Sequence, residues 1–590
     1  MTEYANLNYY KRVMARHSEL VDERRIWDAQ RQVIVEYYRP DITIYSSKDS
    51  AKDGSFLHEA IVEGTGNWAA GVMARGFHSA LVGPSINWRE SHMEETKWDG
   101  DDQINAFLER FDNYLIKQVY AQSNFYEVIG NDVLDGITVG SPVVLIEENV
   151  AKGVIEFKLP HYQENYLKRD WFGRDILYHR QFELSALTAM QKFGKENLPQ
   201  DVQRQLERGE HFAKSKYLQV IYSKGDPIFD DLPKETPTFS DEAQKTRLNY
   251  HPVVNRAWVS HHFAMGVTDV RLQGHLPERN YGYNYNNQPF AAWHYFRNPG
   301  ETYARTPAWS AIYDEKSGQA AWTTMFEAAE QAARPAMIGL KQMKRRTRTG
   351  PGKWTWAQDE AEYNMPPKAV HEGINYPHAM DFVDRIDDKR KRHFNVDLFR
   401  LIDEYSREHD QPPTAYQISQ MIAEKNAQVG PAIVSFDRGL LKPVDDLVIE
   451  IEDRSGRLFS QTDPPDIIWE TNLRTVPKFT GPLAKAQNTA IIMKETIEPL
   501  AVLQPLFDMF PDAKYKIDEG DLVEHFLEQI GFRQQSIVAK EVYDDIKQSL
   551  NMSRARSAEL EQASMAADIS QKLGKGAEEG SPLKQLTGAA

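Results

Sequence analysis

The spacing of hydrophobic positions changes twice along the chain and divides it into three regions. In the first region, residues 3–38 are predicted to form a long helix that ends at Arg39-Pro40-Asp41, because proline cannot continue a helix. Residues 64–80 are predicted to form a helix of small residues that stops at Gly83-Pro84. Residues 101–129 carry apolar side chains at helical spacing, so this region is predicted to be helical.

The second region has the alternation that is typical of strands. Strands are predicted at residues 136–147, 153–160, 176–182, 217–222, 257–263 and 290–295. A turn is expected at Trp171-Phe-Gly173, and Ser185 is predicted to cap a short helix that ends at Gly194. Helices followed by a group of strands indicate an α+β arrangement for the first half of the chain.

The third region returns to helical spacing. One helix is predicted from residue 307 until Pro335 breaks it, and a second is predicted from residue 377 to 399. Between them lies an insert, residues 339–373, that is rich in Pro, Gly, Arg and Trp. The first helix needs a partner helix because it carries one apolar stripe, formed by Trp322, Met325, Phe326, Ala329 and Ala333.

The chain beyond residue 400 is also predicted to be largely helical. A long helix is predicted from Thr414 to residue 452, with kinks at Pro431 and Pro443. Helix is predicted again over residues 481–550, and the composition of the tail from Gly574 indicates a flexible segment. The fold class predicted for the whole chain is therefore α+β and mostly helical.

Composition narrows the class of protein. The chain has 590 residues, of which 41% are hydrophobic and 26% charged, so it can bury real cores and is long enough for three or four domains. It has no cysteine, which excludes disulfides and thiolate metal sites. Its apolar runs are too short to span a bilayer, so no membrane contact is predicted. The net charge of −16 argues against a conventional nucleic-acid binder, which should be basic.

No catalytic signature stands out in the sequence. Gly64-Thr-Gly66 lacks the further glycine and the Gly-Lys-Ser/Thr of nucleotide loops, so it is predicted to be a tight turn at a helix start. His261 and His262 are adjacent in a predicted strand, where neighbours point to opposite faces and cannot easily share a metal ion. No metal and no cofactor are predicted. The chain is therefore more plausibly part of a larger machine than an enzyme.

Two basic clusters and a pair of tryptophans are the candidates for function. One cluster begins the insert, and the run Lys389-Arg-Lys-Arg392 lies on the helix that follows it. These residues either pair with carboxylates such as Asp384, Asp387 and Asp388, or form a basic band that faces phosphates. Trp354 and Trp356 in the insert are either core residues of a small subdomain or anchors of an interface.

A short motif precedes the first of the two helices, Glu301-Thr-Tyr-Ala-Arg305-Thr-Pro307-Ala308. It resembles the Gly-Glu-x-Tyr-Gly-Arg-x-Pro-Ala signature of portal proteins, the head-to-tail connectors of short-tailed double-stranded DNA bacteriophages, with Ala304 in place of the usual Gly. Pro412-Pro413-Thr414-Ala415 and the segment to Pro443 resemble a second family helix, with Gln417 in place of Glu. Phe479-Thr-Gly481-Pro482-Leu483-Ala484 and Trp171-Phe-Gly173-Arg174 resemble two further short motifs, and together the resemblance covers residues 20–550.

The resemblance implies the portal architecture, assembled as a ring of about twelve copies. Mapped onto this chain, it implies a wing at 1–306 and 414–475, stem helices at 307–335 and 376–400, a clip at 336–375, a tunnel loop at 401–413, a helical crown at 476–560 and a C-terminal tail at 561–590. The implied role is a non-enzymatic channel at one capsid vertex of the virion, assembled in the host cytoplasm, through which double-stranded DNA is packaged and ejected.

The same resemblance implies partners and candidate residues. The expected partners are other copies of the chain, DNA held without sequence preference, the large terminase subunit, tail adaptor proteins, and the major capsid and scaffolding proteins. The DNA-channel candidates are Lys341, Lys344, Arg345, Arg346, Lys389, Arg392, Tyr405, Arg407 and His409, and the candidate clip anchors are Trp354 and Trp356. Two alternatives stay open at this point: a tail or adaptor ring protein of the same virion, and a hydrolase built on Asp and His.

Overall fold

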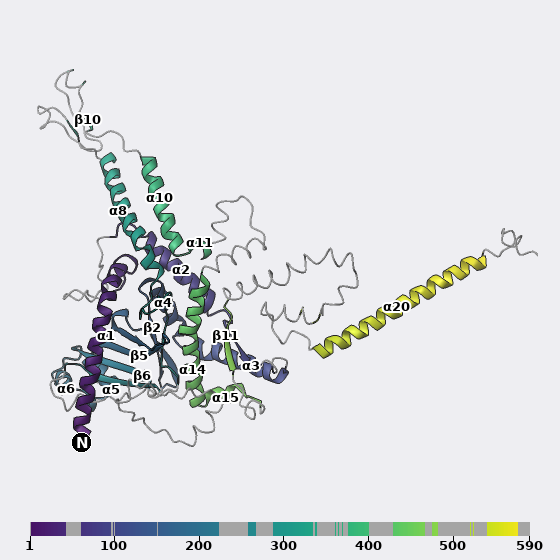
Figure 1. The fold of residues 1–590 in the computed structure, drawn as a ribbon, viewed down its shortest axis with the longest axis horizontal. Coiled ribbons are helices and arrows are strands. Elements are labelled where there is room, and N and C mark those ends of the chain that lie inside the picture. The colour runs from purple at the N-terminus through teal and green to yellow at the C-terminus, as the bar shows by residue number, and fades with distance from the viewer. Residues whose placement is uncertain are drawn as a thin grey trace, which may run out of the picture. The chain divides into compact units, whose positions relative to one another are not determined.

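The computed structural model describes most of the first 481 residues and one long helix near the end of the chain (Figure 1). The described residues are 2–42, 61–95, 98, 101–149, 152–223, 258–266, 287–333, 337–338, 360, 364, 368–369, 376–399, 429–465, 475–481, 520, 523 and 540–575. The chain divides into two compact units, one made of residues 1–95 and 107–487 and the other of 96–106 and 488–590.

A four-stranded antiparallel sheet forms one core of the first unit. Its order is β4 (Asn165–Arg169), β5 (Asp175–Ser185), β6 (Lys214–Ser223) and β7 (Trp258–Ala264). The long helix α1 (Thr2–Tyr38) packs across one face, where Val13 and Leu20 join a cluster of buried strand residues. The burial of alternate strand residues on this face holds α1 against the sheet.

The other face of this sheet packs against two further groups of elements. The helices α5 (Ala186–Phe193) and α6 (Gln200–Glu207) cover part of it. A second sheet, in the order β3 (Val154–Lys158), β2 (Val143–Asn149) and β8 (Phe290–Ala292), contributes to a shared core with it. The predicted strands at 153–160, 176–182, 217–222 and 257–263 are confirmed, and so are the cap at Ser185 and the end of that helix at Gly194.

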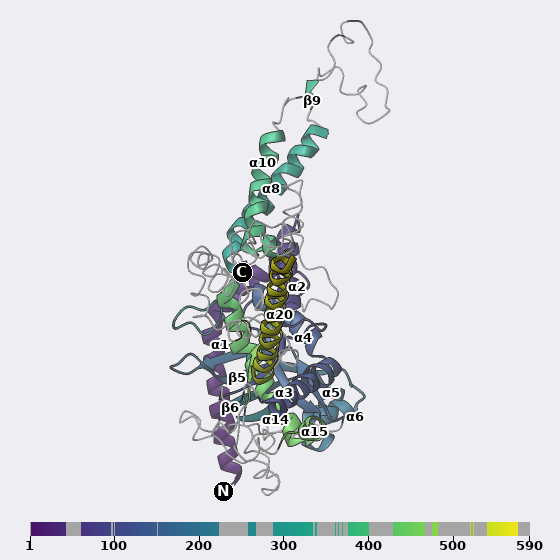
Figure 2. The ribbon, with the colours of Figure 1, turned by 90° about the vertical axis from the view of Figure 1, so that its right-hand side faces the viewer.

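The helical part of the first unit contains the predicted helix pair. The helix α8 (Pro307–Ala333) packs beside α10 (Tyr376–His393), and the two views in Figures 1 and 2 show them running side by side away from the sheets. The helix α2 (Thr65–Leu81) packs against α4 (Phe125–Thr138) and against α10. The main helix contact of α8 is with α10, but only Met325 of the predicted apolar stripe is buried and Phe326 stays exposed.

Three sequence predictions of element boundaries are wrong. Residues 136–138 belong to α4 and not to a strand, because Phe125, Val133 and Ile137 continue a buried helical stripe, and β2 starts only at Val143 after a turn with positive φ at Gly140. The helix predicted over 101–129 consists of α3 (Asp102–Tyr114), a π-helical stretch (Leu115–Tyr120) and the start of α4.

The helix predicted over 377–399 is also interrupted. It breaks at Asn395, where φ is +45°, and resumes as α11 (Val396–Phe399). Later in the chain, a π-helical stretch (Asp437–Leu441) precedes α14 (Lys442–Arg454). It lies next to the predicted kink at Pro443, whose missing N–H removes one bond of the helical ladder.

A short strand and a long helix are described in the later part of the chain. The strand β11 (Thr475–Phe479) pairs antiparallel with β1 (Arg89–Met93), and the hydrogen bond from Thr480 N to Trp88 O extends this pairing. The helix α20 (Lys540–Lys575) continues well past residue 550, where the predicted helix ends. Within the described ranges, no helix is both long and apolar enough to cross a membrane.

Candidate functional site at the base of the helix pair

The loop of residues 301–306 fixes the start of α8. Glu301 and Arg305 form a bidentate ion pair with a shortest distance of 2.7 Å between Oε1 and Nη2. The Leu167 N–H donates to the Tyr303 hydroxyl at 3.2 Å, and the Thr306 hydroxyl donates to the Thr138 carbonyl at 2.7 Å. The helix then opens at Pro307, which has no N–H and so leaves none unpaired in the first turn.

Ala304 fits the centre of this loop. Its side chain is fully buried, and its N–H donates to the Ser141 hydroxyl at 2.7 Å. Among the described residues, positive φ outside glycine occurs only at Ser141, Asn395 and Asp463, so Ala304 has a backbone conformation open to any residue. The departure from the Gly of the motif therefore introduces no backbone strain here.

A buried arginine ties α10 to α8 and to the start of α2. Arg390 is completely buried and donates to Glu63 Oε2 at 2.8 Å and to Glu315 Oε1 at 3.2 Å. It also pairs with Asp387, one turn earlier on α10. Gln319 completes the cluster by donating to Glu315 Oε1 at 2.7 Å and to the Glu63 carbonyl at 2.6 Å. We call Arg390, Glu63, Glu315, Asp387 and Gln319 the Arg390 cluster.

The charges of the Arg390 cluster explain its protonation behaviour. Burial raises the pKa of Glu315, while its bonds to Gln319 and Arg390 act in the opposite direction. Burial alone would lower the pKa of Arg390, but the hydrogen bond to Asp387 and the attraction of Glu315 and Glu63 raise it above its usual value. The guanidinium therefore stays charged. Removing Arg390 or one of its carboxylate partners would leave an uncompensated charge in the interior.

Two glycines make this close approach possible. A Cβ on Gly66 would lie 2.1 Å from Glu315 Oε2, and a Cβ on Gly318 would lie 2.9 Å from the Arg390 guanidinium carbon. Real side chains do not approach so closely, so both positions need the missing Cβ. The segment Gly64-Thr-Gly66 is thus a packing site, and the predicted helix start is confirmed because α2 begins at Thr65.

The structure separates the basic run on α10 into two sides. Lys389 and Arg392 are exposed, whereas Arg390 points into the Arg390 cluster and Lys391 lies 3.5 Å from Asp388. The predicted pairing with carboxylates is therefore confirmed for Arg390 and Lys391. The partners of Arg390 are Glu63, Glu315 and Asp387 of its own chain.

A further exposed arginine joins Lys389 and Arg392. Arg385 is spaced i, i+4 and i+7 with these two residues, which places all three on one side of α10. The same spacing in the sequence is the signal that identifies Arg385 as a third member of this face. Arg385 pairs at 2.9 Å with Asp381, and Asp388 is exposed as well, so the exposed face of α10 carries both signs of charge.

The other predicted site residues lie outside the described residues. These are Lys341, Lys344, Arg345 and Arg346 of the first basic cluster, Trp354 and Trp356 of the insert, and Tyr405, Arg407 and His409 of the predicted tunnel loop. His261 and His262 are in β7, where ring contacts place His261 near Tyr222 and His262 near Phe193, on opposite faces as predicted. The described part of the chain holds no group of three or more potential metal ligands.

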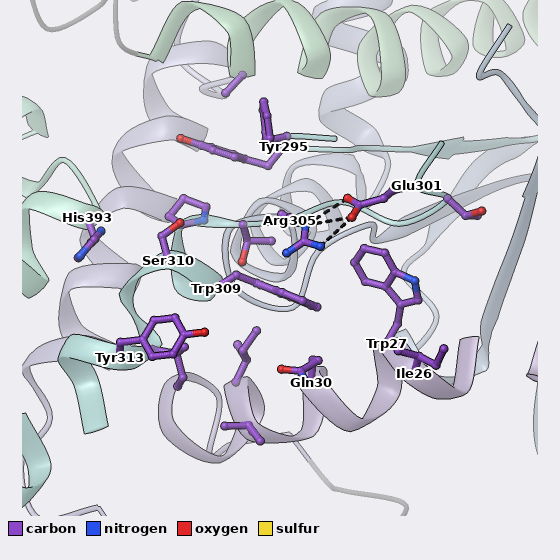
Figure 3. Close-up of a pocket in the computed structure, with 18 of the residues that line it drawn as sticks. Ile26, Trp27, Gln30, Tyr295, Glu301, Arg305, Trp309, Ser310, Tyr313 and His393 are labelled. Atoms are coloured by element: carbon purple, nitrogen blue, oxygen red, sulfur yellow. Dashed lines mark hydrogen bonds and ion pairs between the residues drawn. The ribbon is translucent and has the colours of Figure 1, made fainter. Parts of the chain in front are cut away.

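A groove of about 1350 Å³ lies between α1 and α8 at the base of the helix pair (Figure 3). Trp27 of α1 and Trp309 of α8 flank the Arg305 guanidinium, which lies 5.8 Å and 5.6 Å from their ring centroids. Such contacts add cation–π attraction to the Glu301 ion pair. Ile26 and Tyr313 at the edge of the groove are 77% and 78% exposed, so a large apolar surface faces solvent here.

Comparisons with known proteins all match head to tail connecting proteins or portal proteins of bacteriophages. The family model for the bacteriophage head to tail connecting protein matches residues 10–538. The chain is 20% identical over 567 residues to a probable portal protein of Bordetella phage BPP-1, across 96% of this chain and 95% of that protein. It is 21% identical over 561 residues to a portal protein of Salmonella phage epsilon15, across 94% of this chain and 92% of that protein.

Proposed function

The chain belongs to the family of bacteriophage head to tail connecting proteins, and from this premise we propose that it assembles into a ring that conducts the genome. The ring consists of about twelve copies at one vertex of the capsid. Double-stranded DNA enters through it during packaging and leaves through it during ejection. The observation that carries this proposal is the family match over residues 10–538, supported by two portal relatives that align over nearly their full length.

The proposed ring has further partners. The large terminase subunit docks on it during packaging, and tail adaptor proteins then occupy the same surface. The surrounding capsid and scaffolding proteins contact its rim. The proposed docking surface is the clip at 336–375, with Trp354 and Trp356 as its anchors. No chemical step is assigned to the chain itself, since proteins of this family are structural.

The exposed side chains of the helix pair support packing between copies. Phe326 on α8 is 49% exposed, and Phe382 on α10 is 59% exposed. Two helices that project beyond the sheets and still expose aromatic residues gain free energy when neighbouring copies cover them. A ring in which each copy packs on the next supplies such neighbours without leaving an open end.

The DNA path is proposed to follow the exposed face of α10. Lys389 and Arg392 on that face can contact phosphates, which carry no sequence information. The acidic side chains between them and the net charge of −16 keep the attraction weak, as a duplex that has to slide requires. The other members of the proposed path are Lys341, Lys344, Arg345, Arg346, Tyr405, Arg407 and His409.

Size-exclusion chromatography with light scattering tests the ring. The purified full-length chain is expected to elute as one species of about twelve copies. A monomer or dimer that hydrolyses a substrate would contradict the proposal and favour an enzyme. Rings seen in negative stain that lack a projecting helical stem would instead favour an adaptor ring of the same virion.

A further inference from the structure

The groove between α1 and α8 has the properties of a surface that another protein segment covers. Its volume of about 1350 Å³ exceeds the roughly 300–1,000 Å³ of a typical small-molecule site. Phe296 at its edge is 56% exposed, in addition to Ile26 and Tyr313. Exposed apolar residues gathered around one hollow mark an interaction site.

Most charged side chains around the groove are paired within the chain. Glu301 binds Arg305, and Glu23 accepts from Lys168 Nζ at 2.7 Å. His393 lies 2.9 Å from Asp314 at the opposite side of the groove. Among the described lining residues Lys316 is an exposed cation outside these pairs, so the groove offers little excess charge to a strongly charged ligand and favours an apolar or aromatic segment.

The start of α2 presents such a segment on another face of α8. Gln319 Oε1 accepts from the N–H groups of Val62 at 2.9 Å and Glu63 at 3.1 Å, which fixes this segment on α8. Val62 and Trp68 are each 40% exposed. Trp is the residue most often found as the anchor of a protein interface.

Helix geometry places these two surfaces on different faces of one helix. Tyr313 borders the groove and Glu315 lies against Gly66 at the start of α2, and two residues along a helix correspond to a rotation of about 200°. The groove also reaches Ile312 and Lys316, which are turned by about 60° and 100° from Glu315, so the two surfaces are neighbours around the helix. Figures 1 and 2 likewise show α1 and α2 on different sides of the lower end of α8. Head-to-tail packing in a ring needs two different surfaces on each copy.

We propose that the groove of one copy receives the start of α2 from the next copy. Val62 and Trp68 of one subunit then pack against Trp27, Trp309 and Tyr313 of its neighbour. This inference rests on the proposed ring and specifies which surfaces join its subunits. It predicts that the groove is filled only in the assembled particle.

Cysteine cross-linking tests the contact directly, since the natural chain contains no cysteine. A Cβ at Gly64 meets no atom within 4 Å, and Tyr313 is exposed, so Gly64→Cys and Tyr313→Cys leave the packing of the subunit intact. With a short bismaleimide, assembled G64C/Y313C is expected to give a ladder of linked subunits up to the full ring. Either single variant can link at most two copies.

The matched control places one cysteine elsewhere. Phe212 is 82% exposed in the turn before β6, and F212C/Y313C is expected to give no ladder. A second measurement uses Y313C alone, whose reaction with maleimide is expected to slow at least about tenfold when monomers assemble into rings. F212C should react equally fast in both states.

The failures of the two proposals can be told apart. Rings that form normally but give no ladder, or that leave Y313C fully reactive, would overturn this contact while the ring itself stands. Reactive Y313C that becomes protected only when a tail adaptor is added would assign the groove to that partner and would likewise overturn the contact. A parent chain that never forms rings would overturn both proposals.

Discussion

Arg390 connects three segments that are far apart in the sequence. Its guanidinium contacts Glu63 before α2, Glu315 on α8 and Asp387 on α10, and its own side chain is fully buried. A single point charge could not reach all three carboxylates, whereas the planar guanidinium with its five N–H donors can. We infer that this residue fixes the angle at which the helix pair leaves the rest of the chain.

Replacing Arg390 should therefore lower the free energy of unfolding more than replacing the neighbouring Lys391. Arg390→Met leaves Glu315 and Glu63 without their counter-charge, and we expect the free energy of unfolding to fall by about 3–5 kcal/mol. Lys391→Met removes only a surface contact and should change it by less than about 0.5 kcal/mol. Denaturant unfolding of both variants measures the difference, and equal values would contradict the role given to Arg390.

Replacing either of two glycines on α2 with alanine should change the free energy of unfolding, in opposite directions at the two positions. Gly66→Ala forces a methyl group against the Glu315 carboxylate, and we expect a loss of about 1–3 kcal/mol in the free energy of unfolding. Gly71→Ala meets only the exposed Arg75 side chain, which can move, and the better helix propensity should add about 0.5–1 kcal/mol. Thermal or urea unfolding of the two variants checks the sign, and stabilisation by Gly66→Ala would show that the Arg390 cluster is loosely packed.

Sequence spacing anticipated only part of this residue-scale picture. The run from Lys389 to Arg392 had two open interpretations, and the structure shows that carboxylate pairing applies to Arg390 and Lys391. Asp387 and Asp388 are within one helical turn of these residues, so their involvement could be predicted. Glu63 and Glu315 could not, because nothing local in the sequence indicates which distant carboxylates a buried arginine will meet.

At the scale of elements, the docking of α1 on the four-stranded sheet depends on groups that titrate. His17 of α1 donates from Nε2 to Gln181 Oε1 at 3.0 Å, and its ring stacks on His179 of β5 with centroids 5.6 Å apart. Burial lowers the pKa of His17 and lowers that of His179 well below its usual value. Both imidazoles are therefore harder to protonate in the folded protein than in the unfolded chain.

This arrangement makes stability depend on pH in a defined direction. Below pH about 6.5 the unfolded chain binds protons at these histidines more readily than the folded chain, so the free energy of unfolding decreases as the pH falls. His179→Phe removes one such group. Between pH 6.5 and 5.5, its free energy of unfolding should improve relative to the parent by up to about 1 kcal/mol.

Urea unfolding at both pH values measures this change. The variant His211→Phe, at an exposed position, controls for the replacement of a histidine by phenylalanine. A parallel pH dependence for His179→Phe and the parent would show that His179 takes up its proton in the folded state.

Boundaries of elements were predictable where a local signal exists. Pro40 follows the end of α1, and Ser185 and Gly194 bound α5 as predicted, because caps and breakers act on their own neighbourhood. Residues 136–142 were assigned wrongly to a strand. Their apolar side chains suit a strand equally well, and only packing of α4 against α2 and α8 selects the helix.

On the scale of the whole molecule, the proposed ring combines an acidic protein with a polyanionic cargo. Twelve copies of a chain with net charge −16 repel DNA at long range, so any attraction in the channel has to come from local basic residues. The exposed face of α10 offers Arg385, Lys389 and Arg392 among aspartates. We therefore expect a weakly attractive path and not a tight binding site.

Reversing the charges of Lys389 and Arg392 tests that path. Lys389→Glu/Arg392→Glu takes each chain from −16 to −20 and should leave ring formation intact, while the nuclease-protected DNA per particle falls several-fold. Lys152→Glu/Lys195→Glu makes the same change in charge on surface turns far along the chain from α10, and packaging should stay at the parent level. Equal losses in both variants would assign the effect to net charge alone.

The central claim is that many copies of this chain surround a bore next to the α8–α10 helix pairs. Its most direct test is a cryo-electron microscopy reconstruction of the assembled full-length chain. We predict a closed ring of about twelve subunits whose helix pairs encircle an open central channel wide enough for a DNA duplex, with Lys389 and Arg392 facing it. A single globular subunit, or an assembly in which these helices are enclosed and no channel passes through, would contradict the account.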